Sequence, residues 1–291
     1  MRIFRSLSLV VAVLVLVSPT SAKDWKDVAD ALGRTGTVQP DGAYKVSFPR
    51  GDLSVTADGV AIKPALALGS WAAFNESGGH AMAMGDLVLL ESEVTPVIDE
   101  LQKGGIEQTA LHNHVLGELP RVMYMHFSGH GDAVALARTL HNALALTKTP
   151  MGPPAAPAAA QLDLPTADLD RIIGRAGKAN GGVYQFAVPR AEKITEHGME
   201  IPASMGLATA INFQPTGNGR GAITGDFVLI GSEVNAVIRA LRAGGIVVTA
   251  LHSHMLDEQP RLFFMHFWAN DDATKLATTL RSALDRMNVK K

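Results

Sequence analysis

Short runs of apolar residues predict the strands of this chain. In the first half, residues 45–48, 53–62 and 68–74 have strand patterns, and the middle run turns at Asp58-Gly59. Three further strands are predicted, over residues 86–90, 108–114 and 121–127. The first half is therefore expected to contain a mostly antiparallel sheet.

Two helices are predicted from capping residues and from apolar spacing. Ser92 predicts the start of a helix that runs to about Gln102 and ends at Gly104. Asp132 predicts the cap of a second helix, in which leucines recur every four residues and share one face. Those leucines are Leu136, Leu140 and Leu144.

The whole pattern recurs 140 residues later. Between residues 104–127 and 244–267, 15 of 24 positions are identical by direct count. Ser232, Gly244 and Asp272 take the places of the capping residues of the first half. We therefore predict an α+β fold that is a tandem duplication of one domain, each copy a mostly antiparallel sheet with two helices.

The segments between and before the repeats set the predicted boundaries. Residues 1–22 have arginines, an apolar run and small residues, as a signal peptide does. Residues 147–165 are rich in proline and alanine and predict a linker. The repeat domains are thus predicted at residues 23–146 and 166–291.

Composition restricts the function classes. With 47% hydrophobic and 19% charged residues, the chain has the composition of a folded protein. A formal net charge of −2 without basic runs argues against nucleic-acid binding. The absence of cysteine excludes disulfides, thiolate nucleophiles and thiolate metal sites. Together with the signal peptide, this predicts a periplasmic or secreted protein with no stable membrane anchor after signal cleavage.

A histidine-rich hairpin is the main candidate for chemistry. His112 and His114 alternate along one strand, and His126 lies on the next. If paired residue numbers have an even sum near 238, His112 lies opposite His126 and all three rings line one face. The second half has the same set in His252, His254 and His266. A β-bulge would break this geometry, because one extra residue reverses the face.

Three imidazoles and a carboxylate would suit a divalent metal such as Zn, Mn, Fe or Cu in each half. Glu118 and Glu258, in the hairpin loops, are the candidate catalytic bases or further ligands. Arg121, Arg261 and Tyr124 are candidate contacts for an anion or substrate. The alternatives are a polar site without metal and a purely structural role for the histidines.

Other recurring polar residues have simpler interpretations. Asp86 and Asp226 follow a glycine and suggest turns. Glu93 and Glu233 suit the first turn of a helix, where the helix dipole favours acidic residues. Arg50 and Arg190 follow a proline and are expected to be solvated.

The segments around the three histidines resemble the LppY/LpqO family of bacterial exported proteins. The resemblance rests on Thr-Ala-Leu-His112-Asn-His114, Glu118-Leu-Pro-Arg121 and Met-His126-Phe, and it covers both halves. It implies export and a duplicated domain of unknown function, and it implies no reaction. Some family members look like lipoproteins, whereas this chain has no cysteine at the cleavage site.

The predicted function is an exported protein with a duplicated metal site, and a metal-dependent hydrolase if it is an enzyme. The alternative is a non-enzymatic binding protein that recognises a small molecule or an envelope ligand, such as a cell-wall fragment or a protein partner. A third arrangement has one active copy and one structural copy. The sequence does not choose among them.

Overall fold

The computed structural model describes residues 24–152 and 162–290. The predicted signal peptide, residues 1–22, and the central part of the predicted linker, residues 153–161, lie outside these described residues. No helix in the described ranges has the length and apolar character needed to cross a membrane.

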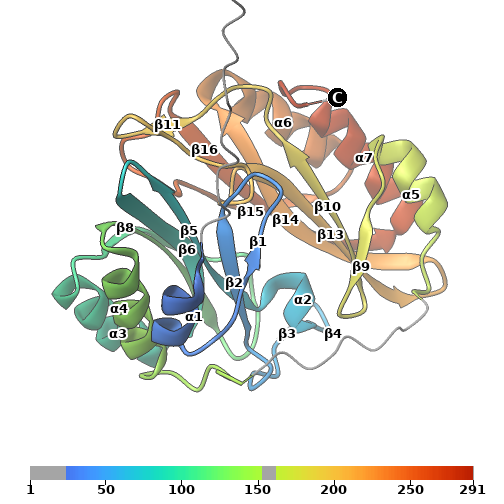
Figure 1. The fold of residues 1–291 in the computed structure, drawn as a ribbon. Helices are drawn as coiled ribbons and strands as arrows, with labels where there is room; N and C mark the ends of the chain where they lie inside the picture. Colours follow the sequence, from blue (N-terminus) through green and yellow to red (C-terminus); the bar gives the residue numbers. More distant parts are fainter. Residues whose placement is uncertain (1–23, 153–161, 291) are drawn as a thin grey trace, which may run out of the picture.

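Each half contains a six-stranded antiparallel sheet with the same strand order, which confirms the predicted fold class (Figure 1). The first half comprises α1 (Lys26–Leu32), β1 (Thr37–Val38), β2 (Tyr44–Pro49), β3 (Thr56–Ala57), β4 (Val60–Ala61), α2 (Pro64–Ala67), β5 (Gly69–Ser77), β6 (His80–Leu90), α3 (Glu91–Lys103), β7 (Glu107–His112), β8 (Val122–Gly131) and α4 (Ala133–Leu144). Its sheet has the order β1-β2-β5-β6-β8-β7.

The second half repeats this plan. It comprises α5 (Thr166–Ile173), β9 (Lys178–Asn180), β10 (Val183–Pro189), β11 (Thr195–Glu196), β12 (Met199–Glu200), β13 (Ala208–Gly217), β14 (Arg220–Ile230), α6 (Gly231–Ala243), β15 (Val247–His252), β16 (Leu262–Asp272) and α7 (Ala273–Leu284). The sheet order is β9-β10-β13-β14-β16-β15. The sequence prediction included the long helix pairs α3/α4 and α6/α7, and the structure adds α1, α2 and α5.

Two predicted helix caps and one predicted turn are confirmed, and one predicted helix cap is wrong. The Asp132 and Asp272 side chains each accept the backbone N–H three residues on, at 2.8 Å, as predicted for helix caps. The strand predicted over residues 53–62 is the β3/β4 hairpin, folded at Asp58-Gly59. The Ser92 cap is wrong: α3 begins at Glu91, and the Glu93 carboxylate accepts the Leu90 N–H at 2.8 Å.

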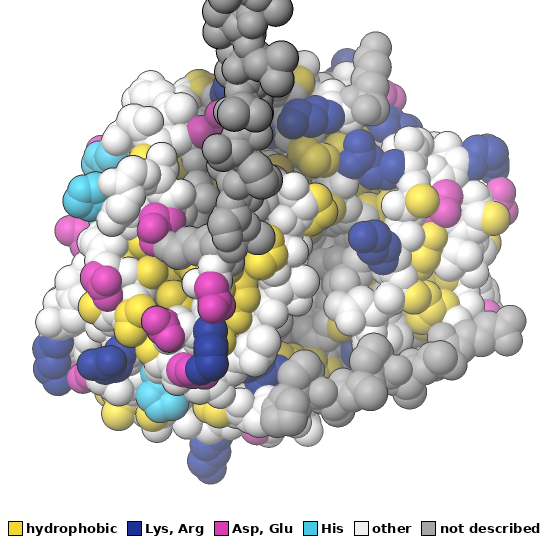
Figure 2. All heavy atoms as spheres, viewed as in Figure 1, with side chains coloured by type: hydrophobic (Ala, Val, Ile, Leu, Met, Phe, Trp, Pro, Cys, Tyr) yellow, Lys and Arg dark blue, Asp and Glu magenta, His cyan; other side chains and the backbone are white. Residues whose placement is uncertain are grey.

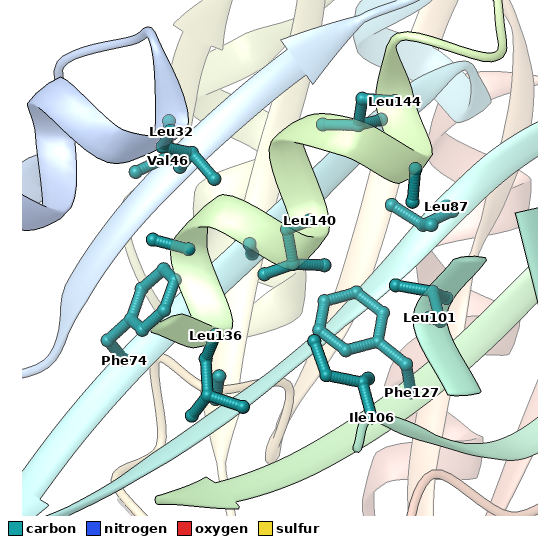
Figure 3. Packing of buried hydrophobic residues seen from close by; sticks show 14 of the residues in the cluster. Leu32, Val46, Phe74, Leu87, Leu101, Ile106, Phe127, Leu136, Leu140 and Leu144 are labelled. Atoms are coloured by element: carbon teal, nitrogen blue, oxygen red, sulfur yellow. The ribbon is translucent and has the colours of Figure 1, made fainter. Parts of the chain in front are cut away.

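Helices cover one face of each sheet. In the first half, Leu136, Leu140 and Leu144 of α4 pack over Phe74 and Phe127 of the sheet (Figure 3). The corresponding cluster of the second half contains Leu276, Leu280 and Leu284 of α7. The four-residue spacing of the leucines explains this, because it keeps their side chains on one side of the helix.

The other face of each sheet packs against the opposite half. One apolar cluster joins the β3/β4 hairpin and α2 to Val183, Ala222 and Trp268. A reciprocal cluster joins the β11/β12 hairpin to Met82 and Met84. The architecture is therefore four-layered, in the order helix, sheet, sheet, helix, and each layer is visible in Figure 1.

Buried ion pairs hold the start of α3 and of α6. Arg50 is fully buried, and its guanidinium contacts the carboxylates of Glu93 and Asp52 at 2.8 Å. Arg190 pairs with Glu233 and Glu192 in the same way. The prediction that Arg50 and Arg190 are solvated is therefore wrong. Their roles are structural, because a buried guanidinium is stable only when carboxylates neutralise it.

On the face seen in Figure 2, acidic and basic side chains are interspersed.

Glycines at the centre of β6 and β14 allow close packing of neighbouring strands. A Cβ at Gly85 would overlap the carbonyl oxygen of Trp71 and lie 2.6 Å from the Phe127 ring. A Cβ at Gly225 would overlap the Ala210 carbonyl oxygen in the same way. These glycines are thus strand residues that no side chain can replace without backbone movement.

We predict that Gly85→Ala and Gly225→Ala each lower the free energy of unfolding by about 1–3 kcal/mol, because the added methyl forces the strands apart. Urea denaturation followed by circular dichroism measures this. Gly51→Ala is the control, since a Cβ there has no atom within 4 Å, and it should change stability by less than about 0.5 kcal/mol. Equal stability of Gly85→Ala and Gly51→Ala would contradict the packing argument.

Candidate metal centre

The strand register places two histidines of each half on the face that meets the other half, and the third, His114 or His254, follows the end of β7 or β15 instead of lying within the predicted strand. In the β7/β8 pair, Ala110 lies opposite His126 and His112 lies opposite Tyr124. The paired numbers sum to 236 and not to the predicted 238, so His112 and His126 are diagonal neighbours. An even sum still keeps them on one face.

The bulge that the sequence could not exclude is present, but it lies outside the motif. The register shifts between Gln108 and Ala110, and at the same place between Val248 and Ala250 in the second half. Both shifts precede the histidines. The side chains of His112 and His252 therefore lie on the same face of the sheet as those of His126 and His266 in the neighbouring strands.

All six histidines lie in one cluster, where the sequence predicted two separate sites. The His112 and His252 rings stack at 3.7 Å between their centroids. The His114 ring lies 3.8 Å from that of His266, and the His126 ring lies 3.7 Å from that of His254. Each of these three contacts crosses from one half to the other. The sheet-to-sheet packing brings the two motifs together, and no local pattern contains that information.

Two reciprocal hydrogen bonds hold the motifs against each other. The Thr109 hydroxyl donates to the His254 carbonyl oxygen at 2.7 Å, and the Thr249 hydroxyl donates to that of His114 at 2.6 Å. Because each half donates one of these hydrogen bonds and accepts the other, the two halves are related by an approximate twofold symmetry. The repeated threonine two residues before the Leu-His-x-His segment therefore has a structural reason.

Burial lowers the pKa of several of the histidine rings and favours their neutral form. The His126 side chain is almost completely buried, and burial, with repulsion from His254, lowers its pKa to about 3. Burial and neighbouring histidines also lower the pKa of His112, His114 and His252. Neutral imidazole is the form that binds metal ions.

The cluster contains many buried polar atoms without hydrogen-bond partners. Within the described residues, these include Asp86 Oδ1, His112 Nδ1, His114 Nε2, His126 Nε2, Asp226 Oδ1 and both ring nitrogens of His252 and His254. A buried polar atom without a partner costs about 1–3 kcal/mol. Such a concentration is unusual in a native protein and is typical of a site whose ligand supplies the missing contacts.

Two of the rings are held with one nitrogen facing the cluster. His126 Nδ1 lies 3.1 Å from the Gly85 carbonyl oxygen, and His266 Nδ1 lies 2.7 Å from that of Gly225. A carbonyl oxygen only accepts, so each Nδ1 carries the proton and each Nε2 presents a lone pair. This backbone contact is the usual way in which a protein orients a metal-binding histidine.

The carboxylates of the cluster are those of Asp86 and Asp226. Asp86 lies directly opposite His126 in the sheet, and its Oδ2 is 3.4 Å from His114 Nε2. Asp226 Oδ2 is 2.9 Å from His254 Nε2, and burial raises the pKa of this carboxyl to about 7. The turn interpretation of both aspartates is wrong, since they are central strand residues. Their signal was a recurring acid beside an apolar run, which indicates a buried carboxylate.

The two predicted glutamates are buried in the hairpin loops, and Glu118 Oε1 has no hydrogen-bond partner within the described residues. Glu258 is fully buried and its oxygens accept from Leu262 N at 2.7 Å and from Arg261 at 3.3 Å. Glu118 is buried too, in the loop that pairs with Thr56 through Leu119. Neither glutamate is in a group of residues whose donor atoms converge.

Of the three residues predicted to contact an anion or substrate, two lie at the surface and one lies in the cluster. The Arg121 and Arg261 side chains are about half exposed, with Arg121 3.7 Å from Glu91. The Tyr124 ring does belong to the cluster, because it stacks on His114 at 3.4 Å. In the second half Phe264 stacks on His254 at 3.5 Å, so the phenol is present on one side only.

Among residues 24–152 and 162–290, three groups bring their donor atoms within 4.8 Å of one another. They are His112, His126 and His252; His112, His114 and His266; and Asp226, His252 and His254. Every donor is nitrogen or oxygen, a set that suits Zn, Mn, Fe or Cu.

The model of the family described as a Domain of Unknown Function (DUF1259) matches residues 26–146 and again residues 167–286. The chain therefore belongs to this family and contains its domain twice. No curated protein matches the chain.

Two solved structures show distant similarity. EtuB from Clostridium kluyveri is 8% identical, with 86% of this chain and 88% of that chain covered and a TM-score of 0.20. A trimeric bacterial microcompartment shell protein, PduB, is 12% identical, with 86% and 89% covered and a TM-score of 0.21. Scores of this size carry no information about the function of this chain.

We predict that Thr109→Val and Thr249→Val each lower the free energy of unfolding by about 1–3 kcal/mol, since a carbonyl oxygen between the halves loses its donor. Thermal unfolding measures this. Thr278→Val is the control, because its hydroxyl donates within an exposed helix turn, to Thr274 O. Thr109→Val and Thr278→Val variants of equal stability would show that the crossed hydrogen bonds contribute nothing.

Proposed function

We propose that the protein binds divalent metal through the histidine cluster between its two halves. One observation carries this proposal: six imidazoles and the Asp226 carboxylate are in converging groups, the Asp86 carboxylate lies 3.4 Å from His114 Nε2, and many of these buried atoms are unpaired within the described residues. A purely structural cluster would leave these atoms without partners, at a cost of about 1–3 kcal/mol for each atom.

The distances between donor atoms fit metal coordination. Two nitrogens that each lie 2.0–2.1 Å from a tetrahedral ion are about 3.3 Å apart. His112 Nε2 and His266 Nε2 are 3.1 Å apart. The His114–Asp86 and His254–Asp226 pairs, at 3.4 Å and 2.9 Å, are in the same range.

The chemistry of a bound ion depends on access. The rings of His126, His254 and His266 are almost fully buried, whereas His114 and His252 are partly exposed. Solvent therefore reaches the cluster beside the two His-x-His segments. If the protein is an enzyme, we propose hydrolysis, for which a bound metal would supply an activated water.

We propose that the protein is exported to the periplasm or secreted, as the residues 1–22 and the LppY/LpqO resemblance suggest. Asp86 Oδ2 and Asp226 Oδ2 lie 3.4 Å and 2.9 Å from the Nε2 atoms of His114 and His254, so these aspartates are the first candidates for carboxylate ligands. A catalytic role for the two glutamates stays a prediction.

Metal analysis of purified protein tests the proposed function. We predict metal bound in stoichiometric amounts after purification without chelator, measured by inductively coupled plasma mass spectrometry. His112→Ala/His252→Ala should weaken binding by more than the roughly 10–100-fold typical for loss of an outer-shell partner.

The matched control for that variant is His80→Ala/His130→Ala, which removes two histidines outside the cluster and should leave metal content unchanged. Wild-type protein that contains no metal and binds none of Zn, Mn, Fe or Cu on addition would refute the proposal. In that case the alternative of a metal-free site for a small molecule or envelope ligand would gain weight.

A second prediction concerns stability. Because metal binds only the folded cluster, an excess of 100 times the Kd should stabilise the protein by about 2.7 kcal/mol. Treatment with EDTA followed by its removal should therefore lower the melting temperature, and added metal should restore it. The His112→Ala/His252→Ala variant should show no such response. An identical chelator effect in both proteins would place the bound metal elsewhere.

A further inference from the structure

The cluster has more donor groups than one ion can use. Structural and catalytic ions of the proposed kind take about four protein ligands. Six histidines and two aspartates offer eight, in two sets related by the approximate twofold symmetry. Unpaired donor atoms occur in both sets, including Asp86 Oδ1 and His114 Nε2 in one and Asp226 Oδ1 and His254 Nε2 in the other.

The contacts also show which donors belong together. His112 and His114 form a converging group with His266 of the other half. Among the described residues, no such group joins the His112–His114 pair to His126, although His112 also converges with His126 and His252 and so lies between the two sets. The reason is the packing: the His114 ring faces His266 at 3.8 Å, and the His126 ring faces His254 at 3.7 Å.

We propose that the cluster binds two metal ions, and that each ion takes the His-x-His pair and aspartate of one half and the third histidine of the other half. The first ion is bound by Asp86, His112, His114 and His266. The second ion is bound by Asp226, His252, His254 and His126. This inference rests on the proposed function and adds the number of ions and the division of ligands.

Each set has the features of a coordination site. In the first, the His112–His266 and His114–Asp86 pairs have the separations expected of two ligands on one ion. In the second, Asp226, His252 and His254 already converge. In the proposed division, His126 and His266 each bind the ion of the opposite half. These are also the two histidines whose rings are oriented by a backbone carbonyl oxygen.

The two ions would be neighbours. His112 and His252, one from each set, stack at 3.7 Å on the approximate twofold axis. Asp86 Oδ2 is 3.4 Å from His114 Nε2 and 4.0 Å from His126 Nε2, so this carboxylate lies between ligands of different ions. A pair of ions joined in this way is the arrangement of two-metal hydrolytic sites, where metals are roughly 3.5–4 Å apart.

The division of ligands has a consequence for the duplication. Neither half alone contains a complete set, because each ion needs one histidine from the other half. The repeat is therefore part of the site itself, and the arrangement with one active and one structural copy does not fit it.

The number of ions and their ligands are tested on the full chain with paired variants. Apo-protein is titrated with Zn²⁺ and with Mn²⁺, and the bound metal is counted after gel filtration. Wild-type protein should bind two ions. His114→Ala/His266→Ala removes two ligands of the same ion and should leave one bound ion. His114→Ala/His126→Ala removes one ligand from each ion and should weaken the binding of both ions.

The two double variants are matched controls for each other, since each removes the partly exposed His114 ring and one almost fully buried ring. Their circular dichroism spectra verify folding. If a variant does not fold, the wild-type count, with the spin coupling of bound Mn²⁺ measured by electron paramagnetic resonance, still decides between one ion and a coupled pair.

The outcomes separate the two proposals. Two ions with the predicted variant pattern support both of them. One ion in the wild type overturns the two-ion site and leaves the proposed function standing. The reverse variant pattern, with His114→Ala/His126→Ala keeping one ion, overturns the division of ligands between halves. No bound metal at all refutes the proposed function.

Discussion

The site depends on one contact, the packing of the two sheets against each other. Each sheet uses one face for its helices, and the face that remains is partly polar because it contains three histidines and an aspartate. Two such faces together bury His112, His126, His254 and His266 and leave His114 and His252 partly exposed, and burial lowers the pKa of rings such as His126 so that they remain neutral. A neutral, dehydrated cluster is costly by itself, and it becomes favourable when a cation supplies the missing partners.

The repeat makes the contact between the sheets approximately symmetric, but the two halves differ in the aromatic ring that stacks on the cluster. The crossed hydrogen bonds from Thr109 and Thr249 and the carbonyl contacts of His126 and His266 occur in both halves. The aromatic rings that stack on the cluster differ, with Tyr124 on one side and Phe264 on the other. The Tyr124 hydroxyl is buried and unpaired within the described residues, so the two sides of the cluster offer different chemistry.

Much of the fold and part of the site could be predicted from the sequence. Periodicity, capping residues and the repeat were enough for the sheets and for the helix pairs, because these are local signals. The same-face arrangement of His112 and His126 followed from strand alternation. The joining of the two motifs could not be predicted, because it depends on which sheet faces meet. The buried Arg50–Glu93 pair was missed because a charged residue next to proline is usually exposed. Asp86 was placed at the start of a predicted strand beside a glycine, so its central position in the longer β6 and the burial of its carboxylate were missed.

The most direct test of the central claim, that residues of both halves bind the same metal ions, is crystallographic. Anomalous difference maps from metal-loaded crystals, measured on both sides of the metal absorption edge, locate the ions without reference to activity. We predict peaks between the sheets, one beside His112, His114 and His266 and the other beside His252, His254 and His126. Peaks confined to one half, or to surface residues away from these histidines, would contradict the account.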